Sequence, residues 1–165
     1  IEGASTLTTD KSVALFERFG IFTRVELESR EEIIHETYAK TINIEALTMI
    51  DMASKDIIPA VASYTEELAN TVIAVKEAGA MGLAQIELLN QVDTLLAEAK
   101  NALTTLEKET ATAAAIKNVK EQAFYYKDIV KQAMADLRTP VDKLEMLVDS
   151  TIWPMPTYGE LMFEV

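Results

Sequence analysis

His35 is the only histidine of the chain, and it follows Glu32 by three residues. A Glu-x-x-His pair is a ligand pattern of di-iron carboxylate bundles, where two such pairs and two further glutamates meet in the core. One histidine cannot supply two pairs, nor the two histidines of a His₂Glu zinc site. Because Glu28, Glu31 and Glu36 crowd the same stretch, we interpret it as a solvated acidic helix face with His35 in local ion pairs.

Two further carboxylates, Asp51 and Asp56, stand in the stretch 41–62, which is apolar on nearly every face. A carboxylate in a helix that packs on several sides needs a partner or a shifted pKa. Lys55 follows Asp51 by four residues, one helical turn away. This spacing favours a structural salt bridge over a catalytic role.

Other kinds of catalytic or binding motif are missing from the sequence. Gly79-Ala80-Met81-Gly82 has neither the spacing of a Walker phosphate loop nor its lysine. The chain contains no cysteine, so it forms no disulfide or thiolate metal site, which agrees with a reducing cytoplasm. We therefore expect no catalytic, cofactor-binding or metal-binding residue in this chain.

The charge of the chain excludes further classes of partner. Its 165 residues carry 15 lysines and arginines against 27 aspartates and glutamates, a net charge of −12. Binding to nucleic acid or to an anionic membrane needs a cationic surface, so neither is expected. No apolar stretch is long enough to cross a membrane, and no signal peptide is visible.

The spacing of glycine and of apolar residues predicts helices throughout the chain. The five glycines leave two long glycine-free runs, 21–78 and 83–158. A short helix is expected over 11–18, and a long one from Arg24 to about Ala78 that bends or breaks near Asp56 to Pro59. Apolar residues then recur every three or four positions in two later seams, the first at Leu88, Val92, Leu95, Ala99, Ala102 and Leu106, the second at Val119, Ala123, Tyr126, Val130, Ala133 and Leu137.

Turn signals separate these helices. Thr23 with Glu26 and Asn118 with Glu121 have the spacing of capping boxes, and a turn is expected within 108–117. Thr139-Pro140 predicts an interruption, after which a helical face continues to about Asp149. The sequence thus predicts an all-α fold, an antiparallel bundle of three to four long helices with a short leading helix.

The last stretch, 150–165, predicts an irregular apolar tail, because two prolines forbid a continuous helix. Large apolar side chains at a free end are costly to leave in water, so we expect the tail to dock. Whether it docks on its own bundle or on another protein is left open. The candidate residues for a domain or subunit contact are Trp153, Pro154, Tyr158, Leu161 and Phe163.

We expect one helical domain over 1–165, with a flexible start at 1–9, a bundle over 10–149 and the docking tail at 150–165. Because the sequence begins at Ile1 and not at a methionine, we expect it to be a portion of a longer protein.

Four segments closely resemble the C-terminal region of type III glutamine synthetases, namely DKSVALFERFGIFTRVELESREEI (10–33), KTINIEALTMIDMASKDIIPAVASYTEELA (40–69), EQAFYYKDIVKQAMADLRTPVDKLEMLVD (121–149) and WPMPTYGELMFEV (153–165). The resemblance extends from about Asp10 to Val165 and is weakest across 80–117. It implies that Val165 is a natural C-terminus.

The resemblance implies a parent enzyme that joins ammonia to glutamate with ATP, through a γ-glutamyl phosphate and with Mg or Mn. It also implies a preceding catalytic domain as partner and a large ring, typically a dodecamer, in the cytoplasm. No catalytic motif of the family matches a position here, so we expect the isolated chain to be inactive. Its role would be structural, in domain contact or assembly. The alternative is an independent helical interaction module with no catalytic role.

Overall fold

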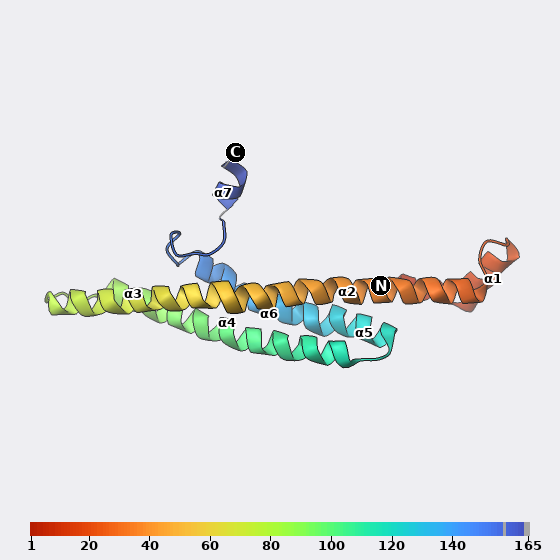
Figure 1. Ribbon diagram of the computed structural model, residues 1–165, viewed down its shortest axis with the longest axis horizontal. Helices are drawn as coiled ribbons and strands as arrows, with labels where there is room; N and C mark the ends of the chain where they lie inside the picture. The colour runs from red at the N-terminus through yellow and green to blue at the C-terminus, as the bar shows by residue number, and fades with distance from the viewer. Residues whose placement is uncertain (157, 164–165) are drawn as a thin grey trace. The chain divides into compact units, whose positions relative to one another are not determined.

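The computed structural model describes residues 1–156 and 158–163, which form helices joined by turns and short irregular segments, with no strand among them. Its elements in chain order are the 3₁₀ turn η1 (Ala4–Thr6), α1 (Asp10–Arg18), α2 (Arg24–Met52), the π-helical turn η2 (Ala53–Ile57), α3 (Ile58–Glu77), α4 (Leu83–Ala115), α5 (Val119–Tyr125), the π-helical turn η3 (Tyr126–Val130), α6 (Lys131–Glu145) and α7 (Tyr158–Phe163) (Figure 1). The predicted all-α fold with a short leading helix is confirmed.

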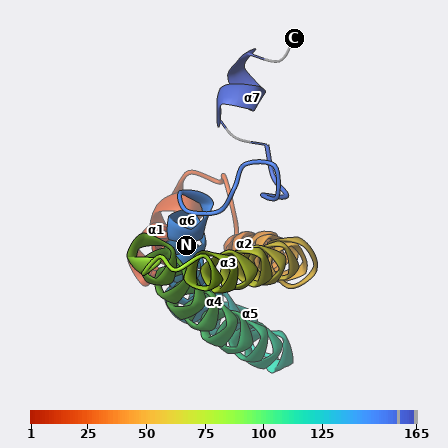
Figure 2. The same ribbon diagram turned by 90° about the vertical axis from the view of Figure 1, so that its left-hand side faces the viewer.

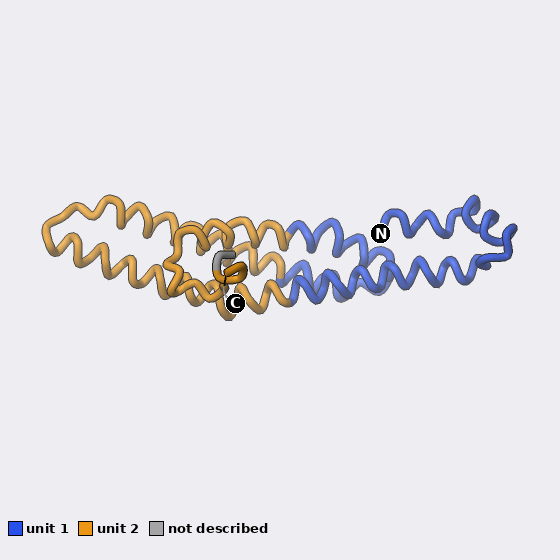
Figure 3. Tube along the Cα trace, turned by 90° about the horizontal axis from the view of Figure 1, so that it is seen from above, with its two compact units in different colours: residues 1–47, 107–132 blue, residues 48–106, 133–165 orange. Residues whose placement is uncertain are grey.

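The chain forms two compact units, coloured separately in Figure 3. Unit 1 comprises Ile1–Leu47 and Glu107–Gln132, and unit 2 comprises Thr48–Leu106 and Ala133–Val165. Within unit 2, α3 and the first part of α4 run antiparallel on either side of the turn at 78–82 (Figures 1 and 2). Within unit 1, the end of α4 and α5 are likewise antiparallel.

The predicted helix starts are present. Thr9 caps α1, its hydroxyl accepting a hydrogen bond from the amide of Ser12. The amide of Thr23 donates to the carboxylate of Glu26 at 2.8 Å, so the capping box at the start of α2 is confirmed. Asn118 caps α5 through the amide of Glu121 at 3.0 Å.

The predicted break near Pro59 is not present, because α2, the π-helical turn 53–57 and α3 follow one another without a non-helical residue. Pro59, which lacks an amide donor, is the second residue of α3, directly after the turn where the hydrogen-bond pattern changes from α to π. Gly79 and Gly82 both have positive φ, +86° and +63°, and form the turn between α3 and α4.

Pro140 does not interrupt the helix as the sequence predicted, because α6 continues through it from Lys131 to Glu145. Proline removes one amide hydrogen bond, but tertiary packing of an apolar face can hold a helix together across such a site. Pro140 is itself buried, on a stripe with Leu137, Val141 and Leu144.

Each unit has its own core, and the predicted seams supply much of it. Buried apolar residues of unit 1 include Val13, Leu27, Ala39, Ile42, Ala46, Ala113, Ala123, Tyr126 and Val130. Those of unit 2 include Ala53, Ile57, Val61, Leu68, Val72, Val92, Ala99, Leu103, Leu106, Ala133, Leu137, Val141, Leu144, Val148 and Trp153. The faces of the long helices opposite these stripes are left to solvent or to partners.

Candidate functional site

A buried polar cluster lies in unit 1 around Glu31 and His35 of α2. Both side chains are buried, with exposed fractions of 9% and 1%. They belong to the inward stripe of α2, which continues through Leu27 and Ala39 in steps of four residues. The interpretation of this stretch as wholly solvated was therefore wrong for these two residues, because one face of an acidic helix turns into the core.

Glu31 joins three segments that are distant in sequence. Its carboxylate accepts hydrogen bonds from the hydroxyl of Thr8 at 2.5 Å and from Nζ of Lys120 at 2.9 Å. Burial alone would raise the pKa of Glu31, but these hydrogen bonds and the charge of Lys120 outweigh it and hold the pKa below its ordinary value. Glu31 is thus an ionised residue that ties the N-terminal segment to α2 and α5.

His35 completes the cluster on the inner side. Its Nδ1 lies 3.9 Å from the carboxylate of Glu31, and its ring packs on Phe124 with centroids 5.9 Å apart. Its buried Nε2 has no hydrogen-bond partner among the described residues. The predicted local ion-pair neighbour of His35 is therefore present as Glu31, but the two side chains lie in the interior and not in solvent.

The cluster does not have the ligands of a metal centre. Among residues 1–156 and 158–163, no group of three or more histidine, cysteine, aspartate or glutamate side chains is arranged to hold a metal ion.

Asp51 at the end of α2 pairs with the exposed Lys55 of the following π-helical turn, as the spacing predicted, and this hydrogen bond raises the pKa of Lys55.

The predicted contact tail divides into an inward and an outward part. Asp149 turns the chain: its carbonyl accepts from the amide of Trp153 at 3.0 Å, and its carboxylate accepts from Thr151, which lowers the pKa of Asp149. This turn brings Trp153 into the core of unit 2, where it is 7% exposed and its indole N–H finds no acceptor among the described residues.

Several other residues of the tail are exposed. Pro154 is exposed, and so are Leu161 and Phe163 of α7, at 66% and 80%. The side chain of Tyr158, also a predicted contact residue, lies outside the described part of the chain. Residues 158–163 form a short helix where the sequence predicted irregular structure, which the two prolines permit because α7 begins after Pro156.

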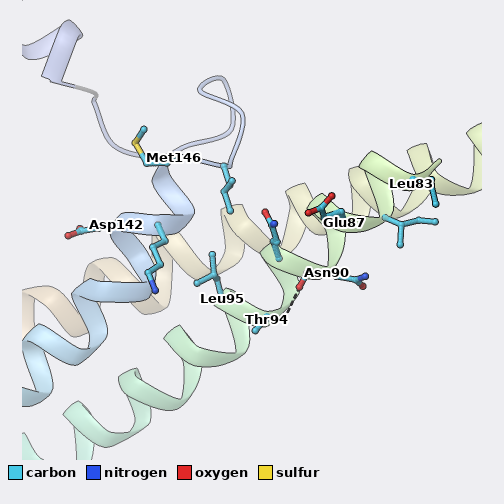
Figure 4. Close-up of a pocket in the computed structure, with 11 residues that line it drawn as sticks. Leu83, Glu87, Asn90, Thr94, Leu95, Asp142 and Met146 are labelled. Carbon is cyan, nitrogen blue, oxygen red and sulfur yellow. Dashed lines mark hydrogen bonds between the residues drawn. The ribbon is translucent and has the colours of Figure 1, made fainter.

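Two apolar grooves flank α6 in unit 2, and the sequence did not indicate either. One, of about 460 Å³, lies among Met49, Met52 and Ile57, the α6 residues Leu137 and Val141, and Met155 and Leu161 of the tail. The other, of about 930 Å³, lies between α4 and the end of α6, with Leu83, Ile86, Leu95, Met146 and Leu147 as its apolar lining (Figure 4). The surface of both grooves is mainly apolar, which favours apolar docking over catalysis.

None of the helices described in the structure is both long and apolar enough to span a membrane.

Comparison with known proteins identifies relatives along the whole chain. The family described as glutamine synthetase C-terminal domain matches residues 1–76. A glutamine synthetase of Butyrivibrio fibrisolvens is 35% identical over 159 residues, covering 95% of this chain and 23% of that protein. A glutamine synthetase of Bacteroides fragilis is 30% identical over 159 residues, covering 93% of this chain and 22% of that protein.

A third relative, the type-3 glutamine synthetase of Dictyostelium discoideum, is 30% identical over 171 residues, covering 98% of this chain. The chain spans 23% of the length of this relative and a similar share of the other two. The resemblance seen in the sequence is thereby confirmed: the chain belongs to the glutamine synthetase family, as a C-terminal domain similar to that of a type-3 enzyme.

Proposed function

We propose that this chain is a structural region of a glutamine synthetase whose active site lies in a preceding catalytic domain. The parent enzyme would ligate ammonia to glutamate with ATP, by way of a γ-glutamyl phosphate. The observation that carries this proposal is the similarity to glutamine synthetases over 95% of the chain, which amounts to only 23% of the relative's length. The remaining length of such an enzyme leaves ample room for a catalytic domain.

The side chains of this region do not fit the chemistry of phosphoryl transfer. That reaction needs metal ions and cationic groups converging on the transferring phosphate. The described residues offer no cluster of metal ligands. Arg24 is paired with Asp10, Arg138 is paired with Asp142, and Arg30 lies over the ring of Phe22. We therefore assign ATP and Mg or Mn to the parent enzyme and derive no step through them here.

The role we propose for the chain is domain contact and assembly, in a dodecamer as the resemblance implies. Trp153 anchors the tail in unit 2, while Leu161 and Phe163 remain exposed for a partner. Pro154 and Tyr158 complete the proposed contact. We also propose a cytoplasmic location for the parent enzyme, as the resemblance implies.

The direct test measures ATP-dependent glutamine formation by the isolated chain and by the full-length enzyme, each with magnesium and with manganese. The full-length enzyme should turn over and the isolated chain should not. Turnover by the isolated chain would overturn the assignment of the active site to the preceding domain, and an inactive full-length protein would overturn the proposed activity.

The assembly role is tested by two deletions in the full-length enzyme. Removing 153–165 should weaken the oligomer or lower its melting temperature, since both the Trp153 anchor and the exposed α7 are lost. Removing 158–165 keeps the anchor and should weaken assembly alone. An unchanged oligomer in both variants would contradict a contact tail.

The second candidate function is an independent helical interaction module, which the two exposed apolar grooves of unit 2 favour. The reading frame upstream of Ile1 distinguishes the two. A catalytic domain encoded in frame supports the first function, and a reading frame that starts just before Lys11 supports the second.

A further inference from the structure

Four large apolar side chains of unit 1 are exposed around the turn between α1 and α2. We call them the α1–α2 knuckle; they are Leu15, Phe19, Ile21 and Val25, with exposed fractions of 53%, 66%, 57% and 73%. All four stand within eleven residues of one another in the sequence. Single exposed apolar residues are ordinary on a protein surface, but such a concentration marks an interaction surface.

The backbone beneath the knuckle is held by a well-defined turn. The amide of Ile21 donates to the carbonyl of Phe16 at 3.0 Å, and the amide of Gly20 donates to that of Glu17 at 3.0 Å. Gly20 has φ +62°, as the Schellman ending of a helix requires. The capping box of Thr23 and Glu26 then starts α2 immediately, so no free loop separates the two helices.

Side chains other than the four exposed ones brace the two helices against each other. Arg24 pairs with Asp10 at 2.9 Å. The rings of Phe16 and Phe22 are 5.8 Å apart, and the guanidinium of Arg30 lies 4.2 Å from the Phe22 centroid (Figure 1 shows the two helices). The knuckle residues are therefore not needed to close the turn. They stand on a rigid support, which lowers the conformational entropy that docking would cost.

The composition of the knuckle suits a protein partner. Aromatic side chains and arginine are enriched at the centres of protein–protein interfaces, where the surface buried is mostly apolar. Here the guanidinium of Arg18 lies 6.0 Å from the ring centroid of Phe19. The net charge of −12 opposes an anionic membrane or nucleic acid as the occupant.

We propose that the α1–α2 knuckle docks in an apolar depression on the catalytic domain of the same glutamine synthetase polypeptide. This inference rests on the proposed function. Two observations favour this occupant over others. The family of glutamine synthetase C-terminal domains matches residues 1–76, the segment that carries the knuckle. The chain is also only 23% of its relative's length, so a much larger domain on the same polypeptide is present at high effective concentration.

Photocrosslinking in the full-length enzyme tests the occupant. Phe19 is replaced by p-benzoylphenylalanine, and the crosslinked peptides are mapped after irradiation. Crosslinks to the catalytic domain of the same polypeptide are expected, so the crosslinked protein should keep the mass of a single chain under denaturing conditions. Crosslinks to residues 1–165 of a second copy, or no crosslink at all, would overturn the inference. Glutamine formation by the unmodified enzyme, measured separately, decides the proposed function independently of this result.

Two charged substitutions test whether the contact matters. Phe19→Glu with Val25→Glu should leave the melting temperature of the isolated chain unchanged, because both side chains are exposed there. In the full-length enzyme, amide hydrogen exchange over 15–25 should be slower than in the isolated chain, because docking covers this segment. In the full-length double variant, exchange over 15–25 should be about tenfold faster, or more, than in the unmodified full-length enzyme.

The matched control is Met81→Glu, which changes a side chain that is 75% exposed at the α3–α4 turn, outside the matched segment. It should leave hydrogen exchange over 15–25 unchanged. Equal exchange over 15–25 in the isolated chain and in the unmodified full-length enzyme would contradict the docking.

Discussion

Unit 1 joins distant parts of its sequence through polar contacts, whereas the core of unit 2 is built from apolar side chains, most of them aliphatic. In unit 1, Glu31 binds both Thr8 and Lys120, and the hydroxyl of Tyr126 donates to the side chain of Asn43 at 2.9 Å. A further ion pair joins Glu2 to Lys127. In unit 2, the ion pairs Lys55–Asp51 and Arg138–Asp142 each join residues one helical turn apart.

This difference indicates that the two kinds of contact do different work: apolar burial supplies the free energy of folding, and polar contacts select how the helices are aligned. An apolar core supplies most of the free energy of folding, but it tolerates small shifts of one helix along another. Hydrogen-bonded charges in a partly buried site have few acceptable geometries, so they select one register. Unit 1 therefore holds its N-terminal segment in one defined position, while unit 2 combines an aliphatic core with apolar grooves that remain open for partners.

The largest expected effect comes from the aliphatic core of unit 2. Leu144→Ala should lower the free energy of unfolding by about 2–5 kcal/mol, since Leu144 is fully buried and its removal leaves a cavity. Urea denaturation of the isolated chain measures it. Met146→Ala, at a side chain that is 83% exposed, is the control and should change stability by no more than about 0.5 kcal/mol. Equal losses of stability in Leu144→Ala and Met146→Ala would contradict the view that the buried apolar core stabilises unit 2.

The polar cluster of unit 1 should give the next effect. Glu31→Gln keeps the shape of the side chain but removes the charge that Lys120 and Thr8 bind, so stability should fall by about 1–3 kcal/mol. Glu32→Gln, one residue along and exposed, is the matched control. An unchanged free energy of unfolding in Glu31→Gln would show that unit 1, like unit 2, depends on apolar packing alone.

Acid should weaken unit 1 through the same residue. Because the pKa of Glu31 is lowered in the folded chain, its contribution is complete above the ordinary glutamate value and is lost as the pH falls toward the folded value. Unfolding free energies measured from about pH 5 to about pH 3 should therefore decline more steeply in the unsubstituted chain than in Glu31→Gln. Parallel declines would exclude Glu31 as a source of the acid sensitivity.

A smaller effect is expected at the hydrogen bond between Tyr126 and Asn43. Tyr126→Phe removes the donor but keeps the buried ring, and should cost about 1 kcal/mol. Asn43→Ala should cost a similar amount, and the two substitutions together should cost less than their sum. Strict additivity in this double-mutant cycle would contradict the contact.

The smallest effect is expected at a surface ion pair of unit 2. Asp142→Asn removes the charge that faces Arg138 at 3.2 Å, and stability should change by no more than about 0.5 kcal/mol because both side chains are exposed. A loss as large as that of Glu31→Gln would show that unit 2 also depends on specific charge pairs.

Local signals in the sequence were sufficient for the starts of α1, α2 and α5. Thr9, Thr23 and Asn118 act through hydrogen bonds to amides three residues away, so their spacing alone predicts the cap. The end of α4 was not predicted, because this helix continues to Ala115 through the stretch 108–117 in which a turn was expected. Pro140 shows the limit of such reasoning, since the packing of α6 decides whether a proline ends the helix, and packing is not a local property.

The polar cluster could not be predicted for the same reason. Glu31 and His35 share the spacing of the buried stripe of α2, but Glu28, Glu32 and Glu36 surround them and conceal the stripe. Lys120, the partner of Glu31, lies 89 residues away in the sequence, and the periodicity of a single helix carries no information about such a distant contact.

For the tail, composition indicated that it must dock, but only the turn at Asp149 determines that Trp153 faces inward.

The π-helical turns at 53–57, between α2 and α3, and at 126–130, between α5 and α6, are places where a residue could be lost from the helices. A π turn accommodates one residue more than the same stretch of α-helix, while the helices on either side keep their orientation. Deleting a single exposed residue there, such as Lys55, would convert the turn to α-helix without rotating the buried stripes beyond it. Single-codon deletions are therefore expected to be tolerated at these two turns and rejected elsewhere along the same helices.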